Sequence, residues 1–326
     1  MIPTRQVAVV IAAFNAEDTI HQAVRSALSQ IECCEVMVVD DASSDRTAAR
    51  ALEAAAGDPR LRVLRNAANF GPARSRNIAI AHTSAPYIAI LDADDFFLPQ
   101  RFSAMFALPD WDCCADNIVF ITAEEQIAQF RSAFKDNFVR SRQLELDRFI
   151  CGNLPKSGRP RGELGFLKPV MRRAFLEQHG LFYAEDCRLG EDFLFYVEAL
   201  AKGARYTVIS RLGYAALVRE NSLSGMHSIE DLAALYTHEL SLLKRLDLDS
   251  EAKGELLRHT RSTLRRLHHR QVLASKASGG KMRGVITGLT RPMAFIDIAN
   301  DKIAKLKAPK VKVPRCLLAE DYFTAR

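Results

Sequence analysis

The chain has 326 residues, of which 48% are hydrophobic and 26% are charged, and these are ordinary values for a folded globular protein. Its length allows a large core, and its composition argues against a chain that is disordered throughout. The formal net charge of +6 is uneven, because residues 251–315 hold sixteen Lys and Arg against four Asp and Glu, which leaves the rest of the chain mildly acidic.

The seven cysteines show no CxxC spacing, which is typical of a reduced cytoplasmic protein and argues against zinc. The apolar run at residues 7–14 superficially resembles a signal peptide, but Asn15, Glu17 and Asp18 follow it without a small-residue cleavage site. We therefore interpret it as a first strand. No apolar run reaches the roughly 18 residues that span a bilayer, so we do not expect an integral membrane protein.

The first 100 residues alternate strand-like apolar runs with segments of helical spacing. Pro72 suits a first helical turn, and Ser44 or Asp45 can cap the helix before it. We expect strands at residues 7–13, 35–39, 62–65 and 87–91, with helices at residues 20–28, 46–56 and 72–82. Strands separated in this way predict an α/β fold with a doubly wound, mostly parallel sheet.

Polar residues follow three of the four strands, and in a parallel sheet these positions meet at one edge, where open α/β sheets bind ligands. They are Asn15 and Glu17, then Asp40 and Asp41, then Asp92, Asp94 and Asp95. Neighbouring carboxylates repel each other unless a cation lies between them, and hard oxygen ligands suit Mg²⁺ or Mn²⁺. The sequence therefore predicts a divalent-metal site that holds a phosphate-bearing ligand, with a solvated acidic turn as the alternative.

After Pro99 the pattern is less regular. We expect strands at residues 117–122 and 206–210, helices at residues 170–179 and 190–203, and a long loop near the site at residues 152–165. Glu191 and Asp192 fall in the first turn of the second helix. The helix dipole favours carboxylates there, so a purely structural role stays open beside a functional one.

The C-terminal part is expected to be helical and basic. Residues 228–277 have helical leucine spacing, and Gly279 with Gly280 is expected to break the helix. Residues 281–312 alternate basic and apolar side chains, as in amphipathic segments on anionic membranes; the alternative is a helix packed on its own domain. Nucleic acid fits less well, because stacking aromatics are not interleaved with the basic residues. We expect domains at residues 1–225, 226–280 and 281–326.

Five motifs resemble, in order and spacing, the inverting family 2 glycosyltransferases of the GT-A fold: VVIAAFNAEDTI, VVDDASSDRT, NFGPARSRNIAI, YIAILDADD and LGEDFLFYVEAL. Within that family, RENSLSGMH and the basic helical extension look most like glucosyltransferases that build succinoglycan-type bacterial exopolysaccharide. The resemblance implies transfer of a sugar, glucose in those relatives, from a UDP-sugar to a lipid-linked oligosaccharide. It also implies a cytoplasmic protein attached peripherally to the inner face of the plasma membrane. The oligomeric state is left open.

The resemblance implies roles for residues at the nucleobase end of the nucleotide pocket. Phe14, Asn15 and Glu17 would line that end, and Asp41 would hydrogen-bond the uracil, with Asp40 beside it. The alternative for Asp40 is a turn-capping role without a ligand.

The resemblance also implies roles at the phosphate end. Arg76, together with Arg74, would reach the pyrophosphate or the base, and Asp92 would bind the ribose side. Asp94, with Asp95, would ligate the metal ion, Mn²⁺ or Mg²⁺. Ordinary positions on a helix surface are the alternative for the two arginines.

Asp192, the second acid of its pair with Glu191, resembles the family's catalytic base. Such a base takes the proton from the acceptor hydroxyl as that oxygen attacks the anomeric carbon, and this direct displacement inverts the anomeric centre. For His227 there are two alternatives: it lies near the diphosphate or metal, or it is an ordinary packed or solvated histidine. A nicotinamide dehydrogenase is excluded because FNAEDT, and not GxGxxG, follows the first strand. A non-catalytic nucleotide-sugar-binding protein or membrane scaffold is the alternative to an enzyme.

Overall fold

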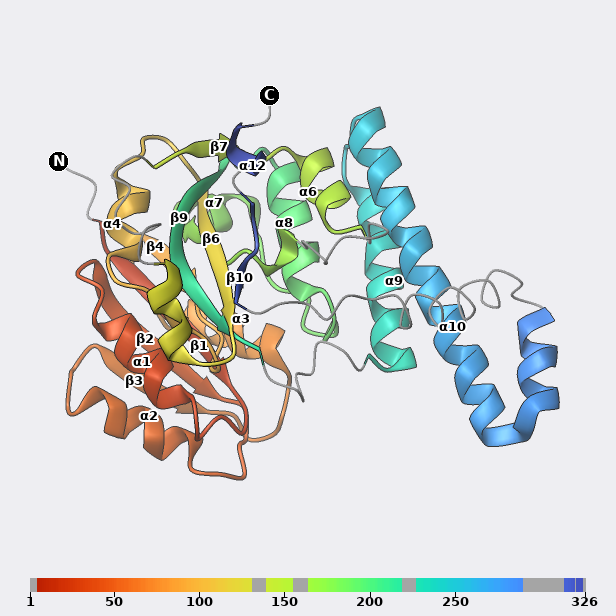
Figure 1. Ribbon diagram of the computed structural model, residues 1–326, viewed down its shortest axis with the longest axis horizontal. Coiled ribbons are helices and arrows are strands. Elements are labelled where there is room, and N and C mark those ends of the chain that lie inside the picture. The colour runs from red at the N-terminus through yellow and green to blue at the C-terminus, as the bar shows by residue number, and fades with distance from the viewer. Residues whose placement is uncertain are drawn as a thin grey trace.

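The computed structural model describes residues 5–130, 139–154, 164–218, 227–289, 314–319 and 321–324. Strands and helices alternate in the first part of the chain, as the sequence predicts (Figure 1). The elements are β1 (Val7–Ala13), α1 (Ile20–Leu28), β2 (Cys33–Asp40), α2 (Thr47–Ala55), β3 (Leu61–Arg65), α3 (Pro72–Ala81) and β4 (Tyr87–Ile90). Gly71, with a φ of 92°, precedes Pro72, and the proline has no N–H to leave unpaired in the first helical turn.

The second part of the chain is built from shorter elements. They are β5 (Phe96–Phe97), α4 (Arg101–Phe106), β6 (Cys113–Ile121), η1 (Glu124–Phe130), β7 (Ser141–Gln143), α6 (Leu146–Gly152), η2 (Leu164–Phe166), β8 (Val170–Arg172), α7 (Arg173–His179), α8 (Glu191–Ala201) and β9 (Tyr206–Leu217). The helix expected at residues 190–203 is confirmed as α8. The strand expected at residues 206–210 is confirmed and continues to Leu217.

The helix predicted at residues 170–179 is wrong in its first part. Val170–Arg172 is the strand β8, and the helix α7 begins only at Arg173. Val170 and Met171 are fully buried between β4 and β6, both of which supply backbone hydrogen-bond partners. A short apolar run of this kind does not distinguish a buried strand from a helix by its spacing alone.

The described strands form one ten-stranded sheet with the order β3-β2-β1-β4-β8-β6-β9-β5, in which β7 also pairs with β9. The long ladders are parallel: β1 with β2, β1 with β4, β2 with β3, and β6 with β9. The antiparallel ladders span only two or three residues each. The sheet is therefore mixed but mostly parallel, and the carboxyl ends of β1, β2 and β4 lie at one edge.

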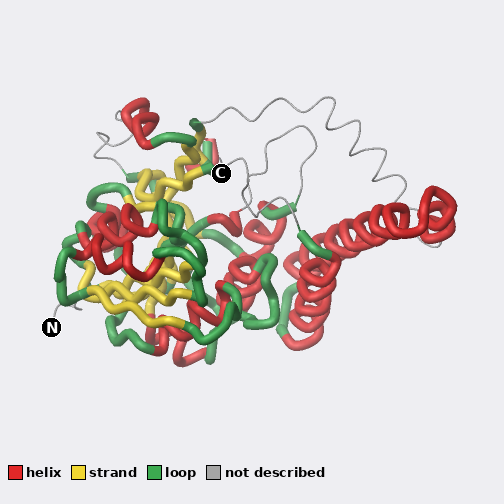
Figure 2. The backbone as a smooth tube through the Cα atoms, turned by 90° about the horizontal axis from the view of Figure 1, so that it is seen from below, coloured by secondary structure: helices red, strands yellow, loops and turns green. Residues whose placement is uncertain are grey.

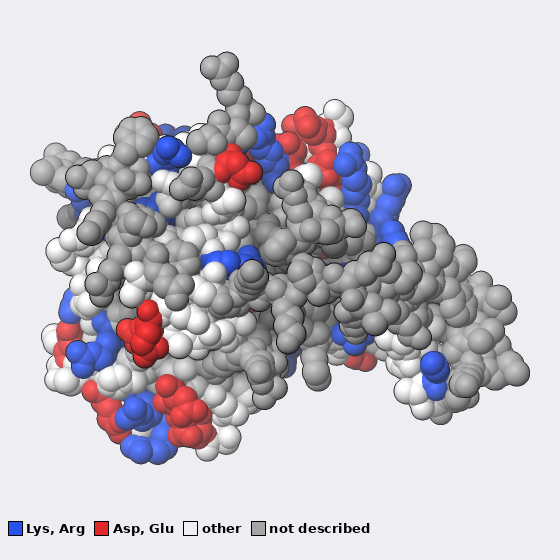
Figure 3. All heavy atoms as spheres, viewed as in Figure 1, with Lys and Arg blue, Asp and Glu red and all other residues white. Residues whose placement is uncertain are grey.

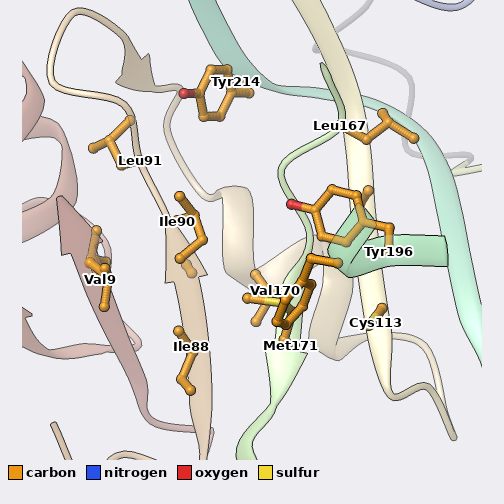
Figure 4. Packing of buried hydrophobic residues seen from close by; sticks show 14 of the residues in the cluster. Val9, Ile88, Ile90, Leu91, Cys113, Leu167, Val170, Met171, Tyr196 and Tyr214 are labelled. Carbon is orange, nitrogen blue, oxygen red and sulfur yellow. The ribbon is translucent and has the colours of Figure 1, made fainter. Parts of the chain in front are cut away.

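Buried apolar residues of neighbouring strands cover both faces of the sheet, and Figure 4 shows part of this core. Val9, Ile88, Ile90, Val170 and Cys113 come from four different strands and are all fully buried. A fully buried aliphatic side chain contributes roughly 1.5–3 kcal/mol relative to an exposed one. This core fixes the ends of β1 and β4, from which the polar residues of the ligand edge project.

Two long helices, α9 (Ile229–Arg245) and α10 (Ser250–Leu289), lie side by side as a hairpin beside the sheet domain (Figure 1). In Figure 2 the far part of α10 projects away from the body. The single helix expected to Ala277 is interrupted at residues 246–249, where Asp249 accepts a hydrogen bond from the Ala252 amide at 2.8 Å. Gly279 and Gly280 do not end α10, because a glycine inside a helix costs only about 1 kcal/mol relative to alanine.

The hairpin is tied to α8 by a buried contact. The His259 ring of α10 stacks on Phe193 of α8, with centroids 4.2 Å apart. His259 Nδ1 is 2.8 Å from Glu239 Oε1 of α9, and Glu239 is fully buried. Because Phe193 follows Asp192 in sequence, the hairpin braces the helix that carries the predicted base.

The last described residues return to the sheet. Arg315–Cys316 forms β10, antiparallel to β6, and α12 (Asp321–Thr324) follows. Asn117 bonds both backbone groups of Leu318 at 2.9 Å. Arg315–Cys316, which the predicted domain at residues 281–326 includes, therefore pairs with a strand of the central sheet. Residues 290–313 and most of the predicted loop at 152–165 lie outside the described residues, as do residues 219–226 of the RENSLSGMH stretch.

The face over α2 carries charges of both signs, visible at the lower left of Figure 3. Arg46 and Arg50 each lie 2.7 Å from Glu53. Exposed pairs of this kind contribute between 0 and about 1 kcal/mol. None of the described helices combines the length and the apolar character that a membrane span needs.

Gly213 of β9 lies against a buried ion pair between Arg101 and Asp116. A Cβ at Gly213 would be 1.7 Å from Asp116 Oδ2 and 2.7 Å from Arg101 Cγ. We expect Gly213→Ala to lower the free energy of unfolding by about 3 kcal/mol, the upper part of the range for overpacked cores. The control is Gly254→Ala in α10, where no atom lies within 4 Å of the added Cβ. That variant should gain up to about 1 kcal/mol. Urea denaturation measures both, and equal midpoints would contradict the packing described.

Candidate active site

The loops after β1 and β2 hold each other at the carboxyl edge of the sheet. Asn15 has a φ of 48°. Its backbone N–H donates to Ser43 Oγ at 2.9 Å, and its side-chain Oδ1 accepts from the backbone N–H of Ser44 at 2.9 Å. Glu17 accepts a hydrogen bond from the Arg46 amide at 3.0 Å. Phe14 is 49% exposed beside them. Asn15 and Glu17 therefore shape the edge, and the Phe14 ring is open to a flat ligand.

Asp41 organises the loop that leads into α3. Its Oδ1 accepts from Asn66 Nδ2 at 2.7 Å and from the Phe70 amide at 3.0 Å, and its Oδ2 accepts from the Gly71 amide at 2.7 Å. Asp40 is fully buried and accepts from the Ser43 amide at 3.0 Å. Both carboxylates therefore have structural partners within the chain.

The residues after β4 separate into two environments. Asp95 is buried, and its two oxygens accept from the Tyr214 hydroxyl at 2.8 Å and from the Leu217 amide at 3.0 Å. Burial, followed by the charges of Asp92 and Asp94, raises the pKa of Asp95 well above its usual value. Asp92 turns instead toward cations from α3 and from the segment before β8.

Arg76 of α3 is the centre of an ion-pair cluster. Its guanidinium, 6% exposed, contacts Asp92 Oδ1 at 2.8 Å, Glu191 Oε1 at 2.8 Å and Asp192 Oδ1 at 3.2 Å. Burial opposes the charge, but the three carboxylates outweigh it and raise the pKa of Arg76 well above its usual value. Arg76 therefore joins the end of β4 to the start of α8.

Lys168 supplies a second cation to this cluster. Its Nζ is 2.6 Å from Asp192 Oδ2 and 3.0 Å from Asp92 Oδ2, and its side chain is 7% exposed. Burial disfavours the charge, but the two carboxylates outweigh it and raise the pKa of Lys168. Burial would likewise raise the pKa of Asp92, but Lys168 and then Arg76 hold it well below its usual range.

We name Asp92, Glu191, Asp192, Arg76 and Lys168 the edge cluster. Three carboxylates face two cations in it, and burial together with the Asp192 charge raises the pKa of Glu191. Asp192 is fixed by a cation at each of its oxygens. A fixed carboxylate at a ligand-binding edge is a group that can accept a proton from a hydroxyl.

Known proteins match this chain along most of its length. The family model described as glycosyl transferase family 2 matches residues 8–173. Succinoglycan biosynthesis protein ExoU from Rhizobium meliloti (strain 1021) is 46% identical over 299 residues, which cover 91% of this chain and 87% of that protein. The chain belongs to glycosyltransferase family 2. The resemblance identified from the five motifs is thereby confirmed.

One further relative of this glycosyltransferase has an informative name. UDP-Glc:alpha-D-GlcNAc-diphosphoundecaprenol beta-1,3-glucosyltransferase WfgD from Escherichia coli is 29% identical over 149 residues, which cover 45% of this chain and 56% of that protein. The alignment is partial.

Solved structures show that this glycosyltransferase has the GT-A fold. S. aureus TarS 1-349 in complex with UDP-GlcNAc aligns with a TM-score of 0.58 and 21% identity, covering 84% of this chain and 74% of that one. Mannosyltransferase PcManGT from Pyrobaculum calidifontis, in complex with GDP-Man and Mn²⁺, aligns with a TM-score of 0.54 and 16% identity, covering 92% and 80%.

The predicted pair Arg74 and Arg76 separates in the structure. Arg76 joins the edge cluster, whereas Arg74 lies over the Phe70 ring at 4.0 Å and 3.7 Å from Glu185. Phe70 belongs to the loop that Asp41 holds, so Arg74 stays near the predicted nucleotide side. His227 lies in the short segment that leads into α9.

Sequence reasoning missed two residues of the site, Lys168 and Tyr214. Tyr214 donates to Asp95 and accepts from the Asp92 amide at 3.2 Å, so it fixes the turn after β4. Each is a single polar side chain in an otherwise apolar run, FLKPVM or GYAAL. A lone polar residue in such a run was the available signal, because burial requires it to find a partner.

The carboxylates after β4 fit a divalent cation that takes only one or two of its ligands from the protein. Among the described residues, no group of three His, Cys, Asp or Glu side chains forms a complete metal cage. Mg²⁺ is commonly bound by only one or two carboxylates, with substrate phosphates and water completing its octahedron. Burial first, and then repulsion from Asp92 and Asp94, raises the pKa of Asp95, and a cation between these carboxylates would relieve the repulsion.

Proposed function

We propose that this glycosyltransferase moves a hexose, glucose in the first instance, from a UDP-sugar to a lipid-linked saccharide in exopolysaccharide synthesis. The observation that carries the proposal is the fixed carboxylate of Asp192, tied through Lys168 to Asp92 at the edge where GT-A sheets bind their donor. The name of the WfgD relative supports the donor and the acceptor class, and the name of the ExoU relative supports a role in succinoglycan synthesis.

The donor is proposed to lie along the carboxyl edge of β1, β2 and β4. Phe14 stacks on the nucleobase, and Asn15 and Glu17 hold the loop that places that ring. A carboxylate offers about four lone-pair sites, and three donors use those of Asp41, so one is left for the uracil. Asp40 holds the loop after β2 through the Ser43 amide, and Asp92 is proposed to contact the ribose side of the donor.

Asp94, with Asp95, is proposed to hold Mn²⁺ or Mg²⁺ against the diphosphate. When bound, the metal ion neutralises the charge that grows on the departing nucleoside diphosphate. Arg74, beside Phe70, supplies a further cation on the nucleotide side. Two unit charges at ~4 Å interact by about 4 kcal/mol at an effective dielectric constant of ~20, so an unneutralised diphosphate would be repelled by these carboxylates.

Asp192 is proposed as the general base, with Glu191 beside it. The acceptor hydroxyl gives its proton to Asp192 while its oxygen attacks the anomeric carbon. The bond from that carbon to the diphosphate oxygen breaks, and UDP leaves with the electron pair. This single displacement converts an α-linked donor into a β-linked product, which agrees with the beta-glucosyltransferase named among the relatives.

A donor screen tests the proposal. Each of several UDP-sugars and GDP-mannose is added to the protein with Mn²⁺ or with EDTA, and the unfolding temperature is recorded. Ligand at 100 times its Kd stabilises a protein by about 2.7 kcal/mol. We expect stabilisation by UDP-glucose with Mn²⁺ and its loss with EDTA or in Asp94→Ala. Stabilisation by none of the sugars would refute the proposed function.

Peripheral membrane attachment is proposed to come from the basic residues of segment 281–312. Because Arg315–Cys316 pairs with β6 of the sheet, charge removal is a cleaner test than truncation. Each Lys or Arg near an anionic surface contributes about 1 kcal/mol. Replacing the lysines of that segment by Gln should move the protein from membrane to soluble fractions; they are Lys281, Lys302, Lys305, Lys307, Lys310 and Lys312. Unchanged fractionation, with Lys202→Gln and Lys244→Gln as the control, would count against it.

A further inference from the structure

We infer that Lys168 is a positioning residue, which holds the base Asp192 and the donor-side Asp92 together through one buried ammonium group. This inference rests on the proposed function and adds a residue for which none of the recognised motifs assigns a role. Lys168 touches both carboxylates, whereas the predicted base and the predicted ribose-binding residue lie 100 positions apart in sequence.

The backbone of Lys168 is rigidly placed. Its carbonyl accepts a hydrogen bond from the guanidinium of Arg101, whose own partner is the buried Asp116. Pro169 follows, which fixes the next φ, and the Leu167 amide donates to the Leu164 carbonyl at 3.0 Å. The lysine stem therefore projects from an anchored segment, and a fixed stem can set the place of its Nζ.

Lys168 and Arg76 contact different oxygens of Asp192. Arg76 holds Oδ1 at 3.2 Å but also serves Glu191 and Asp92, while Lys168 alone holds Oδ2 among the described contacts, at 2.6 Å. Without Lys168, three carboxylates would share one cation. The least costly responses are rotation of Asp192 toward Arg76 or proton uptake by the cluster, and either response removes a base in the working orientation.

The described electrostatic interactions of this pair involve groups from several elements around it. The groups are Arg76 from α3, Asp92 after β4, Tyr183 before α8, Glu191 and Tyr196 of α8, and Tyr206 of β9. The tyrosines have pKa values raised by burial and stay neutral. Among these described groups, Arg76 is the cation that remains when Lys168 is lost, and it already contacts three carboxylates.

The test compares Lys168→Met and Lys168→Arg with the parent, and uses Lys202→Met at the exposed end of α8 as the matched control. With UDP-glucose, Mn²⁺ and a lipid-linked acceptor, Lys168→Met should lose at least 30-fold in kcat at neutral pH. Its KM for the donor should stay within about threefold, and the acid limb of its pH profile should move upward by about one pH unit. Lys168→Arg should recover much of kcat, because it restores the charge.

A second readout keeps this test separate from that of the proposed function. The carboxyl carbon of Asp192 is followed by NMR against pH in the parent and in Lys168→Met, with Asp192→Asn assigning its signal. We expect the titration midpoint to rise in Lys168→Met. An unchanged midpoint, or a folded Lys168→Met with parental kcat and pH profile, would overturn the inference, even where transfer itself is established. Absence of transfer by the parent would instead refute the proposed function, and the NMR titration still decides the role of Lys168.

Discussion

Replacing Asp192 by Asn should lower kcat of sugar transfer by roughly 10²- to 10⁴-fold, the contribution typical of a general base. Asparagine keeps the shape of the side chain but has no charge with which to take the acceptor proton. Binding of the UDP-sugar should change little, because Asp92 and Asp94 are intact. UDP release with acceptor present measures kcat, and calorimetric titration measures binding of the donor.

Glu191→Gln is the matched control for this prediction. Glu191 is the adjacent carboxylate, contacts the same Arg76 at 2.8 Å, and has a pKa raised by burial and by Asp192. We expect a loss of kcat below tenfold in Glu191→Gln. UDP release by Asp192→Asn at the parental rate would show that the base is another residue. Donor binding by the parent without any transfer would favour the non-catalytic alternative.

Replacing Arg101 by Met should cost about 3–5 kcal/mol of unfolding free energy, the loss expected when one partner of a buried ion pair is removed. Arg101 and Asp116 are 0% and 1% exposed, and they share hydrogen bonds of 2.9 to 3.2 Å. Burial already raises the pKa of Asp116 against the opposing effect of Arg101. The free energy of unfolding of a native domain is only about 5–15 kcal/mol, so this single change should markedly lower the unfolding temperature of the protein.

The double variant Arg101→Met, Asp116→Leu provides the control. Replacing a whole buried pair by apolar side chains of similar volume is often close to neutral, so the double variant should recover most of the loss. Urea denaturation of the three proteins gives the free energies. A single variant within 1 kcal/mol of the parent would show that the pair is not needed for stability.

The ligand edge could be predicted from the sequence because its logic is local. The strands end at Ala13, Asp40 and Ile90, and a parallel sheet brings such ends together whatever the details of the helices. A local signal also predicted the place of Asp192 at the start of α8, because a glycine followed by two acidic residues is typical of a helix start.

The ion pairs could not be predicted in this way, because they join residues that are distant in sequence. Arg76 and Asp192 are 116 positions apart, and the arginine was expected to face the nucleotide. Its place among three carboxylates depends on where α3 lies relative to the start of α8, and spacing along one helix does not report that arrangement. Lys168 lies in a run too short and apolar to reveal whether it starts a strand or a helix.

The return of Arg315–Cys316 to β6 was missed for a related reason. Two residues give no periodicity, and the preceding basic residues dominate the composition of that region. Asn117 decides the pairing, because its side chain satisfies both the N–H and the carbonyl of Leu318.

The most direct test is the anomeric configuration of the product. UDP-glucose labelled with ¹³C at C1 is incubated with Mn²⁺, the protein and diphosphate-linked lipid saccharides, and the new glycosidic carbon is observed by NMR. We predict release of UDP together with a β-linked product, and neither in Asp192→Asn. An α-linked product would contradict the single displacement with Asp192 as its base.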